Sequence, residues 1–167
     1  VLEILCRMFP EAPIYTILYD RERKDNRFAD RNVIASFLDF PLARQGHRAF
    51  IPLMPLAARS LKIPEDFHLV ISVTAGFGKG FVCGAQTKHL AYCLTPLRYA
   101  WESHLVSAKF NNPLLPFLLA YLRRWDYKMA QKPDQLLADS KFIAFKIRDF
   151  YRREAEVIYP PVGLSDK

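Results

Sequence analysis

Cysteine is scarce in this chain of 167 residues. The three cysteines, Cys6, Cys83 and Cys93, are odd in number and form no C-x-x-C pair. This usage argues against a zinc site or a disulfide framework and favours a reducing compartment. A run of about 18 apolar residues, which a transmembrane helix needs, is also missing, and residues 1–8 do not resemble a signal peptide. We therefore expect a cytoplasmic protein.

Histidine is equally sparse, with four residues at His47, His68, His89 and His104. None belongs to an H-x-x-x-H pair or to a cluster with carboxylates, so we expect no metal site. His68 and His89 flank the starts of predicted strands, at the end of the sheet opposite the expected site. The simplest interpretation places all four histidines on the surface.

Apolar residues and positive charge are the two components in surplus. The hydrophobic fraction is 51%, enough for one compact domain, and Lys plus Arg exceed Asp plus Glu by 24 − 17 = 7. The excess charge favours anionic partners such as phosphates, nucleotides, acidic glycans or a membrane surface. Because no helix-turn-helix, zinc-finger or RNA-binding signature accompanies the charge, we expect no nucleic-acid partner.

Strand-like and helix-like segments alternate along the chain, a pattern that predicts an α/β fold with a mostly parallel sheet and helices on both of its faces. His68–Thr74 is the clearest strand, because its continuous apolar run is typical of a parallel strand covered on both sides. The other expected strands are Ile14–Tyr19, Val33–Phe37, Lys88–Cys93, Gln135–Asp139 and Ala155–Tyr159. The expected helices are the end of one over residues 1–8, then Pro52–Leu61, part of Tyr99–Lys109, Pro113–Lys132 and Lys141–Arg153, the last capped by Ser140.

The domain organisation follows from the two ends of this pattern. We expect residues 1–160 to form one domain, and its uncapped first helix suggests that the chain is truncated at residue 1. Pro41–Phe50 is expected to be a basic connection, and residues 161–167 are expected to begin a linker to an absent domain.

The glycine-rich segment Thr74–Gly80 directly follows the clearest strand. Ligands of open parallel sheets bind beyond the carboxyl ends of the strands, and three glycines allow backbone amides to approach an anion, with Lys79 adding a positive charge. The segment is neither a G-x-G-x-x-G fingerprint, since Phe81 stands where the third glycine would be, nor a P-loop. An ordinary strand-to-helix turn explains it equally well.

A second segment, Leu94–Trp101, follows the next strand. Arg98 is suited to a phosphate or carboxylate, and Tyr99 and Trp101 to stacking on a sugar or base. The alternative is a structural corner in which both aromatic rings pack into the core. Further along, Arg123 and Arg124 lie among aromatic and apolar residues, an arrangement that suits either contact with an anionic bilayer or an amphipathic helix packed on the sheet.

Several short motifs, taken in order, resemble the amino-terminal domain of retaining glycosyltransferases of family four, in particular the bacterial mannosyltransferase-like enzymes of surface polysaccharide synthesis. They span nearly the whole chain: Leu53–Leu56, Leu69–Ser72, Lys79-Gly80, Tyr92-Cys93, Thr95-Pro96, Arg98–Trp101, Ala138–Phe142 and Val157–Val162.

The resemblance implies one half of a two-domain GT-B enzyme, whose other half binds most of the nucleotide-sugar. It also implies a first strand that would lie just before Val1 and is missing from residues 1–160. It implies a retaining transfer without a metal or other cofactor, the nucleotide-sugar being a co-substrate. It also implies a glycan or lipid-linked acceptor, and a place in the cytoplasm or at the inner face of the membrane. The substrate-binding residues that it suggests are Thr74, Lys79, Gly80, Thr95, Pro96, Arg98, Tyr99 and Trp101.

Two departures from the family leave the catalytic residues unassigned. Leu94 stands where the family commonly has the histidine of Y-C-H-T-P, and Ala75 stands where it often has a second histidine. Neither side chain can carry a proton. The alternative of a non-catalytic module that binds glycans or lipids, or of a degenerate glycosyltransferase, therefore stays open. A nucleotide-binding domain of another Rossmann class is a third hypothesis.

Overall fold

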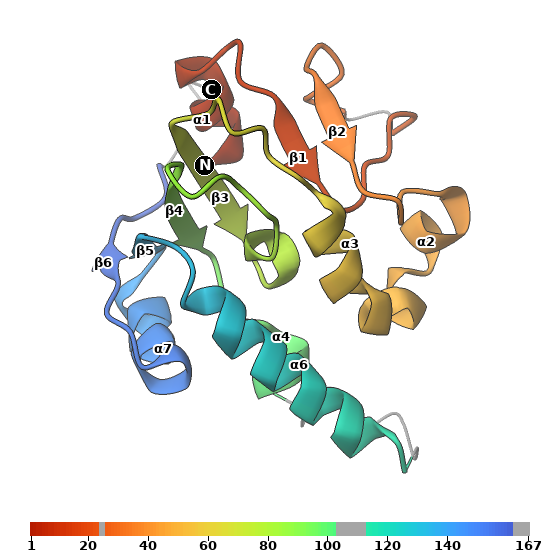
Figure 1. The fold of residues 1–167 in the computed structure, drawn as a ribbon, viewed down its shortest axis with the longest axis vertical. Helices are drawn as coiled ribbons and strands as arrows, with labels where there is room; N and C mark the ends of the chain where they lie inside the picture. The colour runs from red at the N-terminus through yellow and green to blue at the C-terminus, as the bar shows by residue number, and fades with distance from the viewer. Residues whose placement is uncertain (24–25, 103–112, 162–167) are drawn as a thin grey trace, which may run out of the picture.

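The computed structural model describes residues 1–23, 26–102 and 113–161. All strand pairs in this part of the chain are parallel, as the alternating pattern predicts, and they form two sheets (Figure 1). The smaller sheet pairs β1 (Ile14–Thr16) with β2 (Val33–Ala35), and the larger has the order β3 (Leu69–Thr74), β4 (Lys88–Cys93), β5 (Gln135–Ala138), β6 (Glu156–Val157). The fold is therefore α/β and compatible with a Rossmann-like architecture, although the single predicted sheet is divided in two.

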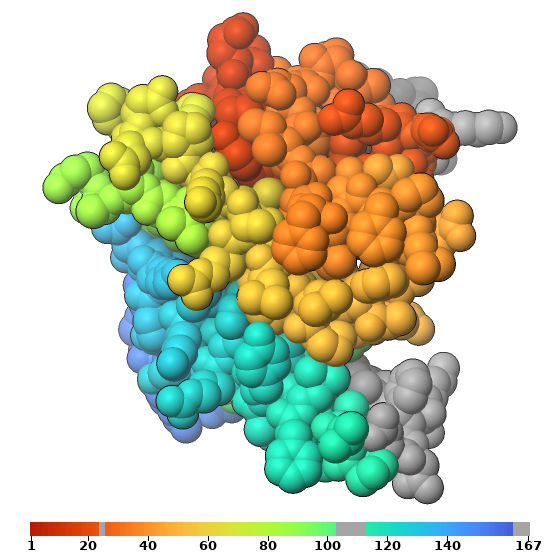
Figure 2. All heavy atoms as spheres, turned by 45° about the vertical axis from the view of Figure 1, so that its right-hand side comes forward, coloured from red at the N-terminus to blue at the C-terminus, as the bar shows by residue number. Residues whose placement is uncertain are grey.

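Helices precede β1 and lie in the connections from β2 to β3, from β4 to β5 and from β5 to β6, whereas a short 3-10 turn connects β3 to β4 and the described residues between β1 and β2 contain no helix. In chain order they are α1 (Leu2–Met8), α2 (Pro41–Gln45), α3 (Met54–Ser60), α4 (Arg98–Trp101), α6 (Leu115–Ala130) and α7 (Lys141–Tyr151), with 3-10 turns η1 (His47–Leu53) and η2 (Phe77–Lys79). Figure 2 shows α6 (teal) and the amino-terminal third of the chain (red to orange) at opposite ends of one face, with the segment around α3 between them.

Several predicted boundaries differ from the observed ones. The segment Pro41–Phe50 is not merely a connection, because Pro41 occupies the first turn of α2, a position where its fixed φ angle suits a helix. Pro52 belongs to η1, so that the following helix begins only at Met54. Of the predicted helix Tyr99–Lys109, α4 accounts for the part up to Trp101, and residues 103–112 lie outside the described part of the chain, as do His104 and most of the predicted linker (162–167).

The largest core cluster joins the central strands to α7. Ala91 and Cys93 of β4 and Leu136 and Ala138 of β5 pack against a set of buried side chains from the two long helices, namely Ala130, Ile143, Ile147 and Tyr151. The predicted cap of α7 is confirmed, because Ser140 Oγ accepts a hydrogen bond from the Ile143 amide over 3.3 Å. This core fixes the carboxyl ends of the central strands, where the candidate site lies.

Candidate functional site at the carboxyl ends of β3 and β4

The two segments singled out in the sequence lie next to each other. β3 and β4 are paired with Thr74 opposite Cys93, so the chain leaves both strands at the same edge. The Leu94 amide donates to the Thr74 carbonyl over 2.9 Å. A Cβ placed on Gly76 would lie 2.7 Å from Cδ1 of Leu97. Thr74–Gly80 and Leu94–Trp101 therefore form one continuous surface edge, as the topology of a parallel sheet predicts.

The glycine-rich segment is a tight turn whose amides are partly used within the protein. Gly76 has φ +143°, a conformation that residues with a side chain rarely adopt. Its amide donates to Oγ1 of the buried Thr74 over 3.0 Å, and the Gly80 amide donates to the Phe77 carbonyl over 3.0 Å. These two amides already have partners, so the interpretation as a structural turn explains this part of the segment.

Lys79 is buried and its ammonium group is bonded inside the molecule. The side chain is 1% exposed, and its Nζ lies 2.5 Å from Oδ1 of Asp126, a residue of α6 that is itself fully buried. The Gly76 carbonyl accepts a second hydrogen bond from Nζ over 2.7 Å. Charges buried in this way need a partner, and Asp126 is that partner. Lys79 thus joins the turn to α6 and presents no charge at the surface, which removes it from the predicted anion contacts.

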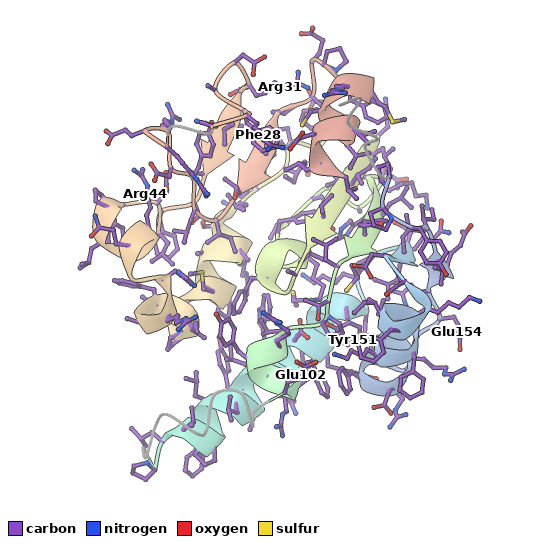
Figure 3. The ribbon with its side chains drawn as sticks, turned by 180° about the vertical axis from the view of Figure 1, so that it is seen from behind. Phe28, Arg31, Arg44, Glu102, Tyr151 and Glu154 are labelled. Carbon is purple, nitrogen blue, oxygen red and sulfur yellow. The ribbon has the colours of Figure 1, made fainter. Side chains whose placement is uncertain are left out.

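The second oxygen of Asp126 accepts three hydrogen bonds, two from the segment Leu94–Trp101 and one from α7. Oδ2 accepts hydrogen bonds from Trp101 Nε1 over 2.8 Å and from the Tyr151 hydroxyl over 2.7 Å, and the Leu97 amide lies 3.4 Å away. We call Lys79, Leu97, Trp101, Asp126 and Tyr151 the Asp126 network. Figure 3 shows Tyr151 beside Glu102, where α4, α6 and α7 converge. Burial is the main cause that raises the pKa of Tyr151 well above its usual value, so its hydroxyl stays protonated as a donor.

Trp101 takes the structural role that the sequence left open. Its ring stacks on Phe150 with the centroids 4.7 Å apart and the planes 6° from parallel. Together with the hydrogen bond to Asp126, this contact packs Trp101 between α4 and α7 and not on an open surface. Gly80 is similarly enclosed, since an added Cβ would lie 2.5 Å from the Trp125 ring.

The exposed part of the edge is formed by other residues of the predicted set. Arg98 is exposed, Thr95 and Tyr99 are half-buried, and Pro96 is buried. Leu94 is 36% exposed and Ala75 is also exposed, so both positions at which the family has histidines face outward. Arg98 is therefore the one cation of the predicted substrate-binding set that the described structure leaves at the surface.

Sequence analysis missed Asp126 because charged residues on a helix are usually solvated. The signal was present, however, in the spacing of α6. Leu119, Leu122, Asp126 and Ala130 follow one another at intervals of three and four residues, and all four are buried. A carboxylate on the buried stripe of an amphipathic helix requires a buried partner.

The surface assignment of His89 is wrong. Its side chain is 4% exposed, and Nε2 lies 2.8 Å from Ser72 Oγ. Burial lowers the pKa of His89 to about 4, despite the opposing influence of Asp134. His89 is the second residue of β4 and its partner Ser72 is on β3, so the pair lies away from the exposed edge and stabilises the sheet. Among the described residues no cluster of metal-ligating side chains occurs.

The basic and aromatic face predicted on α6 is divided between interior and surface. Trp125 packs against Phe77 with the ring centroids 5.5 Å apart, and Arg123 Nε donates to the Ala100 carbonyl over 2.6 Å. Phe117 and Tyr121 are exposed, at 75% and 46%. In the described part of the chain no helix is both long and apolar enough to cross a membrane.

No protein-family model, curated protein or solved structure matches the chain. The resemblance to family-four glycosyltransferases thus rests on the sequence motifs alone.

Proposed function

We propose that this domain is the acceptor-binding half of a glycosyltransferase that moves a sugar, such as mannose, from a nucleotide-sugar to a lipid-linked or polysaccharide acceptor. The observation that carries the proposal is the single edge formed by Thr74–Gly80 and Leu94–Trp101 at the carboxyl ends of two parallel strands. Ligands of open α/β sheets bind in this position, and the two segments hold several of the motifs that resemble the family.

The chemistry of this edge suits an anionic sugar acceptor. The exposed Arg98 guanidinium can donate paired hydrogen bonds to a phosphate or carboxylate. Tyr99, the next residue, packs partly against the core cluster of Leu97, Ala100 and Leu122, and the rest of its ring is open to a ligand. The Asp126 network anchors the backbone of both segments, through the Gly76 carbonyl in one and the Leu97 amide in the other. In this proposal Lys79 and Trp101 therefore position the edge, whereas Arg98 and Tyr99 contact the acceptor.

The proposed parent enzyme consists of this half and a donor half that binds the nucleotide-sugar, and it uses no metal. The isolated 167 residues are then inactive in transfer. We assign no catalytic residue, because Ala75 and Leu94 occupy the positions of the family histidines. Peripheral contact with an anionic membrane is part of the proposal, supported by the exposed Phe117 and Tyr121 on α6 near Arg124.

A non-catalytic glycan- or lipid-binding module is the second candidate. The outward positions of Ala75 and Leu94 favour it, since an edge without imidazoles can bind a ligand but has fewer groups for proton transfer.

Both candidate functions require the edge to bind a glycan or lipid-linked ligand. Measuring the binding of acceptors by the 167-residue chain tests this shared requirement. We expect lipid-linked saccharide phosphates to broaden or shift the NMR signals of Leu94, Arg98 and Tyr99, and Arg98→Ala to weaken binding about tenfold, the effect of losing one charge-assisted hydrogen bond. Arg7→Ala removes an exposed guanidinium on α1, outside the edge, and serves as the matched control. An unchanged affinity in Arg98→Ala would contradict the proposal.

Activity separates the two candidates. The protein joined to its donor half should turn over a nucleotide-sugar in the presence of a lipid-linked acceptor. A folded two-domain protein that turns over no donor, while its acceptor-binding edge binds saccharides, would favour the non-catalytic module.

A further inference from the structure

A small polar pocket lies between the loop that follows β1 and the start of β2. Its volume is about 200 Å³, and its lining includes Tyr19, Arg21, Asn26, Arg31, Asn32 and Val33. Figure 3 shows Arg31 near the top of the molecule, away from Glu102 and Tyr151 in the lower half. The pocket is therefore separate from the edge at the carboxyl ends of β3 and β4, and a ligand bound in it would not depend on the proposed function.

Two arginines give this pocket an unbalanced positive charge. In the described part of the chain no ion pair involves Arg21 or Arg31, whereas the neighbouring Arg27 is paired with Glu3. Of the described residues that line the pocket, none is acidic. Guanidinium groups stay charged at any pH at which proteins are folded. The charge of the lining therefore favours an anionic ligand.

Hydrogen bonds within the loop build the frame of the pocket. Oδ1 of Asn26 accepts from the Tyr19 hydroxyl over 2.9 Å and from the Phe28 amide over 3.1 Å. Nδ2 of the same residue donates to the Arg21 carbonyl over 3.3 Å. These bonds fix the place where the loop turns back towards β2, so the lining is formed without a ligand, and a preorganised site loses less entropy on binding.

Arg31 fixes the opposite wall. Its guanidinium donates to the carbonyls of Cys6, Phe9 and Pro10, which lie at the end of α1. Because these acceptors are neutral, they hold the side chain in place without cancelling its charge. The positive charge of Arg31 therefore acts on the pocket that it lines.

The other wall offers hydrogen-bond donors. Arg21 is exposed and uses one N–H group for the Val33 carbonyl, 3.4 Å away, so most of its donors are open to a ligand. The Asn32 side chain is exposed beside it. The Asn32 carbonyl accepts from the Ile14 amide and thus faces β1. Since backbone groups alternate along a strand, the Val33 amide points to the outer edge of β2, where the pocket lies.

We propose that this pocket binds the phosphate group of a small soluble phosphomonoester. In this assignment Arg21 donates paired hydrogen bonds to phosphate oxygens, Asn32 and the Val33 amide add neutral donors, and Arg31 supplies charge. A phosphomonoester carries about −1.5 to −2 charges near neutral pH and offers three acceptor oxygens, which matches two unpaired arginines. The volume of about 200 Å³ is below the roughly 300–1,000 Å³ of pockets for drug-sized ligands, so the ligand is small.

Acidic residues around the pocket favour a soluble ligand over a lipid headgroup. Asp20, Glu22 and Asp30 are exposed in the same loop and do not line the pocket. A flat anionic membrane would come close to these carboxylates and be repelled by them. A single phosphate group, in contrast, contacts only the lining.

Titration of the isotope-labelled 167-residue chain with methyl phosphate, followed by NMR, tests the proposal. We expect the signals of the Val33 amide, the Asn32 side-chain amide and Arg21 Nε to shift and saturate. Arg21→Ala should weaken binding at least about tenfold, because it removes charge-assisted hydrogen bonds. Arg23→Ala removes an exposed arginine of the same loop outside the lining and should keep the affinity. Equal affinities of the two variants, or an equal response to sodium chloride at the same ionic strength, would overturn the proposal.

A second pair of variants keeps the test decisive if Arg21→Ala disturbs the loop. Asn32→Asp places a carboxylate in the lining at an exposed side chain and should weaken phosphate binding about tenfold or more. Gln45→Glu makes the same change of charge on the exposed surface of α2, outside the lining, and should leave binding unchanged. Undiminished binding in Asn32→Asp would contradict the assignment.

Vesicles distinguish the two sources of a phosphate group. Phosphatidylcholine vesicles that contain phosphatidic acid should not compete with methyl phosphate for the Val33 and Asn32 signals. If the chain instead sediments with these vesicles, loses this binding in Arg21→Ala but not in Arg23→Ala, and does not respond to methyl phosphate, the soluble ligand is the wrong assignment.

Discussion

Nζ of Lys79 and Oδ1 of Asp126 lie 2.5 Å apart although the two residues are 47 positions apart in the sequence, and both side chains are excluded from solvent. The pair joins the turn after β3 to the middle of α6. Through the other oxygen of Asp126 it reaches α7 and the end of α4. The turn after β3 and the segment after β4 are thus anchored to a single carboxylate.

Replacement of Asp126 should strongly destabilise the domain. Asp126→Asn leaves the Lys79 ammonium buried without an opposite charge, a change that typically costs about 3–5 kcal/mol. Urea denaturation followed by tryptophan fluorescence measures the loss, because Trp101 is bonded to the same carboxylate. As a control, Asp149→Asn removes a carboxylate from the exposed pair with Arg152 and should leave the denaturation midpoint nearly unchanged.

A double variant tests whether the two charges act as a pair. Lys79→Met combined with Asp126→Asn removes both charges, so the destabilisation should be clearly smaller than the sum of the two single effects. Additive effects would show that Lys79 and Asp126 contribute independently and would contradict the buried ion pair.

Gly76 should not tolerate a side chain. In Gly76→Ala the residue would keep a φ angle of +143° and bring its Cβ to 2.7 Å from Leu97, and such backbone strain costs on the order of 1–3 kcal/mol. Gly84→Ala is the control, because its Cβ would come no nearer than 3.3 Å to a neighbour and no positive φ is involved. Equal denaturation midpoints for the two variants would contradict this account.

The sequence was sufficient for the features that depend on local patterns. The apolar runs predicted the strands β3 and β4, and Ser140 predicted the start of α7. Because the two strands are parallel, the pattern also predicted that Thr74 and Leu94 lie at the same edge. The role of Asp126 depends on contacts between distant segments, and local propensity contains no information about them. The same holds for His89, whose burial is set by Phe81, 4.6 Å away between ring centroids, and by Ser72.

The division into two sheets also exceeds what the pattern predicts. Alternating strands and helices indicate a parallel sheet but not which strands are neighbours. β1 and β3 belong to different sheets and are not paired with each other. Which parallel strands become neighbours depends on how the connecting segments pack, and the local pattern does not contain this information.

His89 should make the stability of the domain depend on pH in a defined window. Burial lowers its pKa to about 4 in the folded protein, from the ordinary histidine pKa of 6.5, so protonation favours the unfolded state. The contribution of neutral His89 is complete above pH 6.5 and is lost as the pH falls towards 4, which amounts to about 3 kcal/mol. His89→Gln cannot titrate and should flatten the decline of the free energy of unfolding between pH 6.5 and 4.

The matched control for this experiment is His68→Gln, which replaces an exposed histidine at the start of the neighbouring strand. It should keep the pH profile of the unchanged chain. Because His89→Gln also alters the bond to Ser72, the shapes of the profiles are compared and not their absolute levels. Parallel profiles for His89→Gln and the unchanged chain would contradict the buried neutral imidazole.

Cys93 should be the least reactive of the three thiols. It is 1% exposed, and burial raises the pKa of its thiol to about 12, so the reactive thiolate is nearly absent at neutral pH. Cys6 and Cys83 are only half-buried. With iodoacetamide under native conditions, mass spectrometry should find Cys6 and Cys83 modified first and Cys93 only at the rate of unfolding. In Asp126→Asn, which weakens the same core, Cys93 should become modified earlier, whereas the exposed-pair control Asp149→Asn should not change its rate. Rapid modification of Cys93 in the unchanged, folded chain would show that the carboxyl end of β4 opens to solvent and would contradict the closed packing beneath the edge.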